Sequence, residues 1–546
     1  MGKHKFKTKI STKDGNQTDK INILVKKLAK QKPIDFDDWT KIKQKFISEL
    51  KMPPASTTDI LKSYQMLKRD KKIKINDFLE QKLKKKPVRS LSGVTVVAVL
   101  TKPWPCPGHC LYCPLEKGIP KSYLSGEPAV ERAKALNYNP FLQVKKRIEM
   151  LEQGGHPTDK IELIVIGGTW SYLPKKYQTW FIKRCFEAAN DIRIKNKKSK
   201  IKNKNLSDLQ KINETAKHRI IGLTLETRPD YIDPKEIKRM RELGCTRVEL
   251  GIQITDDKIL EKNKRGHGIK EIIKATEFLK NAGFKICYHL MPGLYGSSPK
   301  KDFKKFKEVF TKQDYQPDMI KIYPCVVTKG SMLYKLFKEK KYKPYGNKRL
   351  TNLLIKIKLI VPPYIRINRL IRDIPAWQIQ GGNKISNLRE LVQKKMKKSG
   401  QSCQCIRCRE IKGEKIKIEN LKLVQREYLA SNGKEIFLSF EDVKKNKIAA
   451  FLRLRLPFVK NNFIKTLNKA SLVREIHTYG QLIEINQRNK KAIQHLGLGK
   501  RLMTKAEDIT KKNNYKKIAV IAGVGVRQYY RSLGYKLKNT YMIKEL

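Results

Sequence analysis

The sequence predicts an α/β protein made of a partial (β/α) barrel and a second α/β domain, with a basic helical region in front of the barrel. Two observations predict this arrangement. Between residues 94 and 327, short β-branched runs alternate with longer charged segments of helical periodicity. Near residue 497, a glycine-rich stretch leads directly into another helix. A chain of 546 residues has room for two or more cores.

The first region, residues 1–88, is rich in lysine and is interrupted by Pro53 and Pro54. Apolar spacing from Ile21 to Ala29 and from Trp39 to Leu50 predicts short helices with wet, basic faces. Such faces either bind phosphate groups or stay solvated, and composition alone leaves both interpretations open.

The second region, residues 89–385, contains six predicted strands. They are Thr95–Leu100, Ile161–Ile166, Ile220–Leu225, Arg247–Gly251, Phe284–His289 and Ile320–Tyr323. In barrels of parallel strands, chemistry collects at the carboxyl ends of the strands. Polar and glycine residues follow the first five strands: Cys106 to Cys113, Gly167-Gly168-Thr169, Glu226 to Asp230, Gln253, and His289 with Met291-Pro292-Gly293. The sequence therefore predicts a functional site at this end of the barrel.

The loop after the first strand carries Cys106, Cys110 and Cys113 in the spacing C-x3-C-x2-C. Three thiolates on one loop can each bind one iron of a [4Fe-4S] cluster, which leaves the fourth iron without a protein ligand. A zinc knuckle is the alternative, but structural zinc sites usually have four protein ligands, and no matching second half follows. The loop resembles that of radical-SAM enzymes, in which the open iron binds S-adenosyl-L-methionine.

The next strand ends fit the same resemblance. Gly167 and Gly168 let the backbone approach a ligand closely, although such a pair also forms simple tight turns. They lie where radical-SAM proteins keep the glycine motif that meets the methionine amino group. Glu226 and Arg228 are expected to bind the ribose or the carboxylate of the same ligand, with a surface ion pair as the alternative.

A second cysteine group lies in the linker of residues 386–414. Cys403, Cys405 and Cys408 place three thiols within six residues. Such a group can ligate a structural zinc ion together with a fourth ligand from elsewhere. A redox-active pair is the competing interpretation.

The last region, residues 415–546, contains the spacing Q-x-x-G-x-G at Gln494, Gly497 and Gly499, followed by a helix to about Thr510. Strand-like runs flank it at Leu482–Ile485 and Lys517–Ile521. The spacing resembles the pyrophosphate loop of GNAT acetyltransferases, in which backbone N–H groups and a helix N-terminus face the phosphates of coenzyme A.

Radical-SAM and GNAT regions in this order, with the segments ETRPD, NKRGHG, MPGL and GVGVRQYYRSLGY, resemble the family of the Elongator catalytic subunit. The resemblance extends from about Pro53 to Leu546. It implies a partial radical-SAM barrel followed by a GNAT-fold acetyltransferase domain. It also implies modification of the wobble uridine (U34) of tRNA.

The resemblance further implies roles for individual residues. Lys160 matches a lysine that contacts acetyl-CoA from the radical-SAM side. The implied contacts on the GNAT side are Glu475, Ile476, His477, Thr478, Leu498, Gly499, Lys500 and Tyr530, together with Gln494 and Gly497 of the pyrophosphate loop. Lys160, Tyr529 and Tyr530 are the candidate catalytic residues of this set.

The implied product is 5-carboxymethyluridine, formed from acetyl-CoA by radical chemistry. Uridine C5 is an unactivated vinylic carbon and an acetyl methyl is a poor nucleophile, so polar acyl transfer cannot join them, whereas a carbon radical can. A protein lysine acetyltransferase with a structural or regulatory barrel is the main alternative, but it gains nothing from a cluster at Cys106, Cys110 and Cys113. A tRNA-binding scaffold without turnover is the other alternative.

The composition agrees with an RNA partner. The chain has 120 Lys and Arg against 51 Asp and Glu, a formal charge of +69. A field of this size attracts polyanions, although AT-rich coding produces similar compositions. Together with the motifs it predicts binding of the anticodon stem-loop of tRNA.

Other partners and the compartment follow from the cysteines and the apolar runs. Six of the ten cysteines fall in two tight groups, which favours metal ligation in a reducing cytoplasm. The longest apolar runs are too short to span a membrane.

The chemistry needs an electron donor of unknown identity. The compact cysteine spacing resembles the prokaryotic branch of the family, which favours a chain acting alone or as a homodimer over a larger Elongator assembly.

Overall fold

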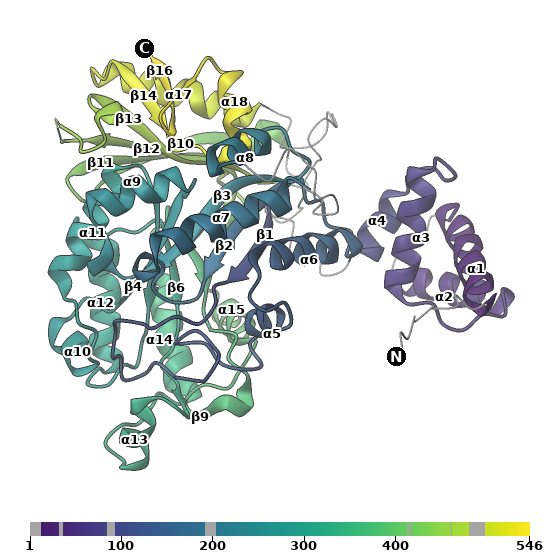
Figure 1. Ribbon diagram of the computed structural model, residues 1–546, viewed down its shortest axis with the longest axis horizontal. Coiled ribbons are helices and arrows are strands. Elements are labelled where there is room, and N and C mark those ends of the chain that lie inside the picture. The colour runs from purple at the N-terminus through teal and green to yellow at the C-terminus, as the bar shows by residue number, and fades with distance from the viewer. Residues whose placement is uncertain are drawn as a thin grey trace, which may run out of the picture. The chain divides into compact units, whose positions relative to one another are not determined.

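The computed structural model describes residues 12–31, 36–84, 93–191, 204–411, 414, 417–459, 461–479 and 497–546. Contacts divide the chain into two compact units (Figure 1). The first comprises residues 1–90 and 147–158, and the second comprises residues 91–146 and 159–546. Among the described residues, no helix is both long and apolar enough to cross a lipid bilayer.

The first unit is a small helical bundle. Its helices are α1 (Thr12–Ala29), α2 (Phe36–Glu49), α3 (Thr57–Arg69) and α4 (Asp77–Leu83). Leu24, Trp39 and Tyr64 lie at its centre with under a tenth of their surface exposed. The helices predicted from Ile21 and from Trp39 are confirmed, because these apolar positions repeat on one face of α1 and of α2.

The second unit begins with an open barrel of seven parallel strands in sequence order. The strands are β1 (Thr95–Leu100), β2 (Lys160–Ile166), β3 (Arg219–Thr227), β4 (Arg247–Gln253), β5 (Lys285–Leu290), β6 (Met319–Ile322) and β8 (Arg366–Arg369). All six predicted strands are confirmed to within two residues at each end. The seventh strand, β8, was not predicted. Since β1 and β8 form the two edges of the sheet, the barrel is partial, as expected.

Helices connect successive strands of the barrel. They are α5 (Pro128–Lys134), α6 (Pro140–Gln153), α7 (Lys175–Ala189), α8 (Leu206–Asn213), α9 (Pro234–Glu242), α10 (Asp257–Lys262), α11 (Ile269–Asn281), α12 (Pro299–Thr311), α13 (Met332–Lys338) and α14 (Asn347–Leu359). Two helices follow β8: α15 (Leu388–Lys398) and α16 (Ile406–Arg409). A separate two-stranded sheet is formed by β7 (Val327–Thr328) and β9 (Ile379–Gly381).

The two faces of the barrel strands differ in chemistry. On β2, Ile161, Leu163 and Val165 are buried on the face that the helices cover. The opposite face of β2 carries Glu162, whose carboxylate pairs with Arg247 of β4. Barrel interiors are usually filled by branched aliphatic side chains, so this charged interior points to a binding or catalytic role.

A second sheet follows in the order β10-β11-β12-β13-β14-β16-β15. Its strands are β10 (Leu421–Leu429), β11 (Gly433–Asp442), β12 (Lys447–Pro457), β13 (Ala470–Thr478), β14 (Lys517–Val520), β15 (Lys536–Lys538) and β16 (Tyr541–Glu545). Helix α17 (Leu498–Lys512) packs on β12 and β13, and the short α18 (Arg527–Arg531) precedes β15. The strand predicted at Lys517 and the helix predicted after Gly499 are confirmed. The strand predicted at Leu482–Ile485 lies outside the described residues.

The second sheet packs against the amino-terminal ends of the barrel strands (Figure 1). The Arg474 guanidinium of β13 donates to an oxygen of Asp318, just before β6, at 2.9 Å and to the Phe284 carbonyl, just before β5, at 2.7 Å. The Tyr541 hydroxyl of β16 donates to the Ala282 carbonyl at 2.8 Å. The loop that carries Cys106, Cys110 and Cys113 follows the carboxyl end of β1, so this loop and the second sheet occupy opposite ends of the barrel.

Candidate functional site

The three barrel cysteines lie on the loop after β1, as predicted. Cys110 and Cys113 form a turn in which the Cys113 N–H donates to the Cys110 carbonyl at 3.2 Å. The Sγ atoms of Cys106, Cys110 and Cys113 do not all lie within 4.8 Å of one another, although the three residues are all described. Tetrahedral zinc holds its sulfur ligands about 3.8 Å apart, given Zn–S bonds of about 2.3 Å. The three thiols therefore do not form a group as compact as a single zinc ion requires.

Positive charge surrounds this loop. The Arg265 guanidinium donates to Cys110 Sγ at 3.2 Å, and Lys121 donates to the Gly108 carbonyl. A hydrogen bond from Cys113 and the nearby Arg265 lower the pKa of Cys110 to about 4, whereas the same hydrogen bond raises the pKa of Cys113. Thiolate is the form that ligates iron, so Arg265 favours the ligating form of Cys110.

The glycine pair after β2 has the backbone that a close-approaching ligand needs. Gly167 and Gly168 have φ angles of +135° and +100°, which side-chain-bearing residues rarely adopt. A Cβ atom at Gly167 would overlap the Thr101 hydroxyl, whereas one at Gly168 would meet no atom closer than 3.9 Å. The space beside Gly168 therefore provides an open backbone cradle near the cysteine loop.

Arg228 lies beside the cysteine loop but is held by its own neighbours. Its guanidinium donates to both carboxylate oxygens of Asp230, at 2.9 and 2.8 Å. A Cβ atom at Gly108 would lie 2.5 Å from Arg228 Nη1, so the guanidinium packs directly on the loop. Burial opposes ionisation of Asp230, but hydrogen bonds from His267 and Arg228 lower its pKa to about 2. The Arg228–Asp230 ion pair therefore supports the cysteine loop. The hydrogen bonds of the Arg228 guanidinium are made to Asp230 of the protein itself.

Glu226 faces the inside of the barrel, where it begins a chain of polar contacts. It accepts a hydrogen bond from the Tyr123 hydroxyl at 3.2 Å and lies 3.4 Å from His289 Nδ1. His289 Nε2 lies 2.8 Å from Glu249, which also pairs with Lys321. Burial opposes ionisation of Glu249, but Lys321 and the hydrogen bond with His289 hold its pKa well below the usual range.

Sequence reasoning missed several of these residues. Arg265 was noticed only as part of the NKRGHG segment, and Tyr123, Glu249 and Lys321 were not noticed at all. A charged residue at an inward position of a buried strand is the signal that identifies Glu249, because such a position normally holds an aliphatic side chain.

The linker cysteines form a compact group. Cys403, Cys405 and Cys408 have Sγ atoms that all lie within 4.8 Å of one another, the spacing that a single metal ion requires. No carboxylate, imidazole or further thiol of the described chain lies within the same distance. Lys358 Nζ lies 3.6 Å from Cys408 Sγ, and hydrogen bonds from the other two cysteines lower the pKa of Cys408. The group lies between the sheets, because α16 contacts both β8 and β12.

The second sheet splits beside α17. β13 pairs with β14 only from Ala470 to Val473, and no described residue of β14 continues the ladder along Arg474–Thr478. The described part of the sheet therefore opens between β13 and β14 beyond Val473. Gly497 has a φ of +68° and precedes the first turn of α17, whose N-terminus points at the same region. An extended chain with phosphate groups fits an open strand edge beside a helix N-terminus.

Several predicted residues meet at this split. A Cβ atom at Gly499 would lie 3.0 Å from the Tyr529 hydroxyl, 3.7 Å from Ile476 Cδ1 and 3.9 Å from Thr478 Oγ1. Leu498 is buried at the start of α17 and Lys500 follows on its first turn. Gln494 lies outside the described residues.

The remaining predicted residues of the second sheet point elsewhere. Tyr530 is 4% exposed and belongs to the hydrophobic core, whereas Tyr529 is 39% exposed. Glu475 accepts a hydrogen bond from Arg453 at 2.9 Å and lies 3.7 Å from Lys285 of the barrel. The His477 ring stacks on Phe451. Tyr529 is thus the tyrosine that reaches the split.

Lys160 is the first residue of β2 and lies on the rim of the barrel that faces the second sheet. Its register partner on β3 is Arg219. A Cβ atom at Gly525, in the turn before α18, would lie 2.6 Å from the Cβ of Arg219. Burial lowers the pKa of Lys160. Lys160 is therefore close to the second sheet and far from the cysteine loop.

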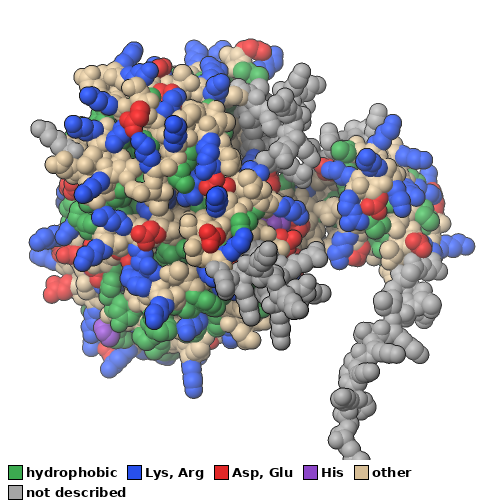
Figure 2. Space-filling view, turned by 45° about the horizontal axis from the view of Figure 1, so that its top comes forward, with side chains coloured by type: hydrophobic (Ala, Val, Ile, Leu, Met, Phe, Trp, Pro, Cys, Tyr) green, Lys and Arg blue, Asp and Glu red, His purple; other side chains and the backbone are tan. Residues whose placement is uncertain are grey.

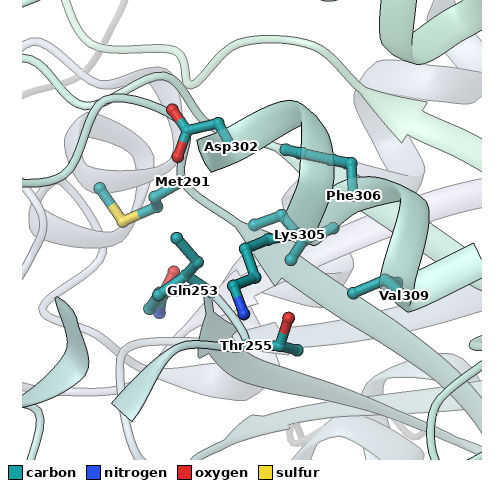
Figure 3. A pocket seen from close by; sticks show the side chains of 9 residues that line it. Gln253, Thr255, Met291, Asp302, Lys305, Phe306 and Val309 are labelled. Atoms are coloured by element: carbon teal, nitrogen blue, oxygen red, sulfur yellow. The ribbon is translucent and has the colours of Figure 1, made fainter. Parts of the chain in front are cut away.

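A small pocket lies between the ends of β4 and β5 and helix α12 (Figure 3). Gln253, Met291 and Lys305 line it together with Asp302. The Asp302 carboxylate already accepts hydrogen bonds from the Gly293 N–H at 2.8 Å and the Tyr345 hydroxyl at 2.7 Å. The pocket is therefore lined by Gln253 and Met291, two of the predicted strand-end residues, but by none of the cysteines, Gly168 or Glu226.

An open parallel barrel with three cysteines on the loop after its first strand defines a radical S-adenosylmethionine protein. The Radical SAM superfamily model matches residues 106–308, and the Radical_SAM C-terminal domain matches residues 317–398. Proteins of this class carry a [4Fe-4S] cluster and use S-adenosylmethionine.

Comparison with individual proteins narrows the class. The chain is 49% identical to the tRNA uridine(34) acetyltransferase of Methanocaldococcus infernus, over 85% of this chain and 88% of that protein. It is 38% identical to human Elongator complex protein 3, over 86% and 87% of the two chains. A solved structure of the M. infernus Elp3 with an N-terminal deletion matches with a TM-score of 0.72 and 46% identity, covering 83% of this chain and all of that one. The chain belongs to the family of tRNA uridine(34) acetyltransferases and Elongator complex protein 3.

Proposed function

We propose that this chain modifies the wobble uridine of tRNA by attaching a carboxymethyl group derived from acetyl-CoA to uridine C5, in place of the C5 hydrogen, with coenzyme A released when water hydrolyses the thioester. Its family membership supports the tRNA substrate, since its relatives are named for uridine 34 of tRNA. One observation carries the proposal: a single compact unit contains two candidate sites. The cysteine loop lies at one end of the barrel, and the opening between β13 and β14 lies beside the N-terminus of α17 at the other end.

Cys106, Cys110 and Cys113 hold the [4Fe-4S] cluster in this proposal. When bound, the cluster and S-adenosylmethionine supply a carbon-centred radical able to remove hydrogen from an acetyl methyl group. Arg265 keeps Cys110 in the thiolate form, and the open backbone at Gly168 receives the methionine part of S-adenosylmethionine. Glu226 orients the ribose and is itself held by Tyr123 and His289.

Acetyl-CoA binds at the split in the second sheet. The open edge of β13 along Glu475–Thr478 pairs with the pantetheine amides, and the N-terminus of α17 at Gly497–Lys500 receives the pyrophosphate. Tyr529 lies against Gly499 and closes the site near the thioester, and Lys160 contacts the coenzyme from the barrel. Tyr530 acts by supporting Tyr529, because its own ring is buried.

The two sites are separated by the length of the barrel strands. Seven residues of β2 span about 20 Å at about 3.3 Å per residue. The acetyl group therefore crosses the interior of the barrel, where Arg247 pairs with Glu162 and Glu249, and Lys321 supplies a second positive charge beside Glu249. A polar interior of this kind accommodates a thioester and its amides better than an aliphatic one would.

Three further assignments complete the proposal. Cys403, Cys405 and Cys408 bind a structural zinc ion that ties the barrel to the second sheet. The chain works in the cytoplasm, as its free thiols require a reducing compartment. It receives electrons from a separate donor and acts alone or as a homodimer.

The test is anaerobic incubation of the reconstituted full chain with tRNA, acetyl-CoA, S-adenosylmethionine and a reductant, followed by mass spectrometry of the nucleosides. We expect 5-carboxymethyluridine and 5′-deoxyadenosine from the wild type and neither from Cys106→Ala. Modified uridine from Cys106→Ala, or acetylated protein without modified uridine from the wild type, contradicts the proposal. The second outcome supports a protein lysine acetyltransferase instead.

A further inference from the structure

Three aromatic side chains form a continuous surface next to the cysteine loop. Trp104, Tyr177 and Trp180, named here the aromatic platform, stack in a row. The ring centroids of Trp104 and Tyr177 are 6.4 Å apart with 18° between the planes. Those of Tyr177 and Trp180 are 5.5 Å apart with 33° between the planes. The Trp104 and Tyr177 rings are therefore nearly parallel, and the Trp180 ring is tilted against Tyr177.

The platform is held in place by the protein itself. The Lys102 N–H donates to the Tyr177 hydroxyl at 3.1 Å, which ties α7 to the segment before the cysteine loop. The Phe181 ring lies beneath Tyr177 and Trp180 and packs on the buried Trp170. The orientation of the outer rings is thus fixed before any ligand arrives, which reduces the entropic cost of binding.

The platform is partly exposed, and a lysine lies beside two of its three rings. Trp180 is 44% exposed, which leaves much of its indole face in water. Lys102 Nζ lies 5.1 Å from the centroid of Trp104 and 5.2 Å from that of Tyr177. Aromatic faces combined with exposed lysine are what single-stranded nucleic acids bind, because bases stack on the rings while phosphates meet the cations.

The platform adjoins the reaction site. Trp104 lies two residues before Cys106, whose Sγ is 4.0 Å from the Thr169 hydroxyl. The segment after Thr169 presents Tyr172, which is 42% exposed and packs edge-on against Tyr231 at 5.8 Å. Half-buried Trp104 and exposed Tyr172 therefore lie on two segments that flank Cys106.

We propose that the aromatic platform stacks unpaired bases next to the target uridine in a single-stranded RNA loop. The inference rests on the proposed function, because it assumes an RNA substrate. Stacking holds the neighbouring bases and leaves the target base free to enter the barrel. Because every base has a stacking face, the platform contributes affinity for loops without reading their sequence.

The test measures RNA binding by the full chain and needs no turnover. A fluorescent anticodon stem-loop and a continuous duplex of the same stem sequence are titrated with wild type, Trp180→Ala and Trp180→Phe. Loss of one stacked base weakens binding by roughly 5- to 150-fold, so we expect Trp180→Ala to bind the stem-loop at least about fivefold more weakly. Trp180→Phe retains a ring and should recover most of this loss. Phe458→Ala, which removes another exposed ring in the second sheet, serves as the matched control.

The outcomes separate this inference from the proposed function. Equal stem-loop binding by wild type and Trp180→Ala overturns the platform while leaving the tRNA substrate intact. An equal loss of duplex binding by Trp180→Ala also overturns it, since paired bases cannot stack on side chains. If the wild type binds neither RNA, the proposed function fails. A loss confined to the stem-loop, together with unchanged binding by Phe458→Ala, supports the platform.

Discussion

Arg265 illustrates what single residues contribute to the site. It is 155 positions away from Cys110 in the sequence, yet its guanidinium donates to the Cys110 sulfur. The spacing of the three cysteines is local, so it could be predicted from the sequence. The cation that maintains the thiolate could not, because one arginine among 120 basic residues carries no local pattern. The same holds for Glu249 and Lys321, whose inward direction depends on strand register.

Gly499 gives a prediction about coenzyme binding. A Cβ atom there would lie 3.0 Å from the Tyr529 hydroxyl, so Gly499→Ala narrows the space at the split in the second sheet. Alanine also favours the helical state of α17 by up to about 1 kcal/mol. We therefore expect thermal stability to be retained while acetyl-CoA affinity falls at least about tenfold, as measured by calorimetry. Gly346→Ala is the control, because nothing lies within 4 Å of a Cβ at that position. Unchanged acetyl-CoA affinity in Gly499→Ala would place the coenzyme elsewhere.

Lys280 gives a prediction about pH. It is fully buried at the end of α11, with its Nζ 3.6 Å from Glu435, and burial lowers its pKa to about 8 from 10.5. Between pH 8 and 10.5 the unfolded state binds more protons than the folded state, so this lysine makes stability rise with pH in that window. At pH values below 8, the buried charge of Lys280 lowers the free energy of unfolding by about 3 kcal/mol relative to pH 10.5. Each pKa unit corresponds to about 1.4 kcal/mol.

Lys280→Met should therefore be more stable than the wild type at pH 7. Glu435 keeps its bonds to Arg455 and Arg474, so the substitution leaves no unpaired carboxylate. The difference should shrink as the pH rises from 8 to 10, as measured by urea unfolding. A difference that is constant across this range would show that the wild-type lysine is charged throughout.

At the scale of elements, local sequence predicted strands better than it predicted how they assemble. The six predicted barrel strands are runs of β-branched residues buried on one or both faces, and all six are present. β8 was missed because its four residues, Arg-Ile-Asn-Arg, bury only Ile367 fully and have no apolar run. The packing of the second sheet on the barrel depends on pairs such as Arg474 and Asp318, which are 156 residues apart. No local pattern encodes such a pair.

The turn between β14 and α18 gives a prediction about this packing. A Cβ atom at Gly523 would overlap the Ile221 carbonyl of β3, and one at Gly525 would lie 2.6 Å from Arg219. Backbone atoms cannot move aside as a flexible side chain can. Gly523→Ala should therefore separate the second sheet from the barrel and lower stability by several kcal/mol. Limited proteolysis is expected to cleave it faster than the wild type. Gly346→Ala, at a glycine with open space around it and no positive φ, is the matched control. Equal cleavage rates for Gly523→Ala and the wild type would exclude the proposed contact.

At the scale of the whole molecule, the charge of +69 acts over both units. Figure 2 shows Lys and Arg side chains spread over the visible face of each unit, with fewer acidic ones among them. An electrostatic field of this kind increases the rate at which RNA associates with the protein. It does not determine how the protein is positioned on the RNA. Position comes from particular groups of lysines, and the first unit presents one such group in the turn after α3, at Lys71, Lys72 and Lys74.

Neutralising that turn tests whether the first unit binds tRNA. Each phosphate contact that is lost lowers the salt dependence of binding by about 0.7 to 0.9 in the slope of log affinity against log salt. Replacing Lys71, Lys72 and Lys74 with glutamine should therefore weaken tRNA binding at low salt and flatten the slope by up to about 2 to 3. The same charge removed from the second unit, by replacing Lys511, Lys512 and Lys516 at and after the end of α17 with glutamine, should lower the slope by less than about 1. These measurements distinguish a local contact from a general field, because a field responds equally to either set of substitutions. Identical slopes for the two triple variants would mean that the first unit contributes charge only, and that tRNA is positioned by the second unit alone.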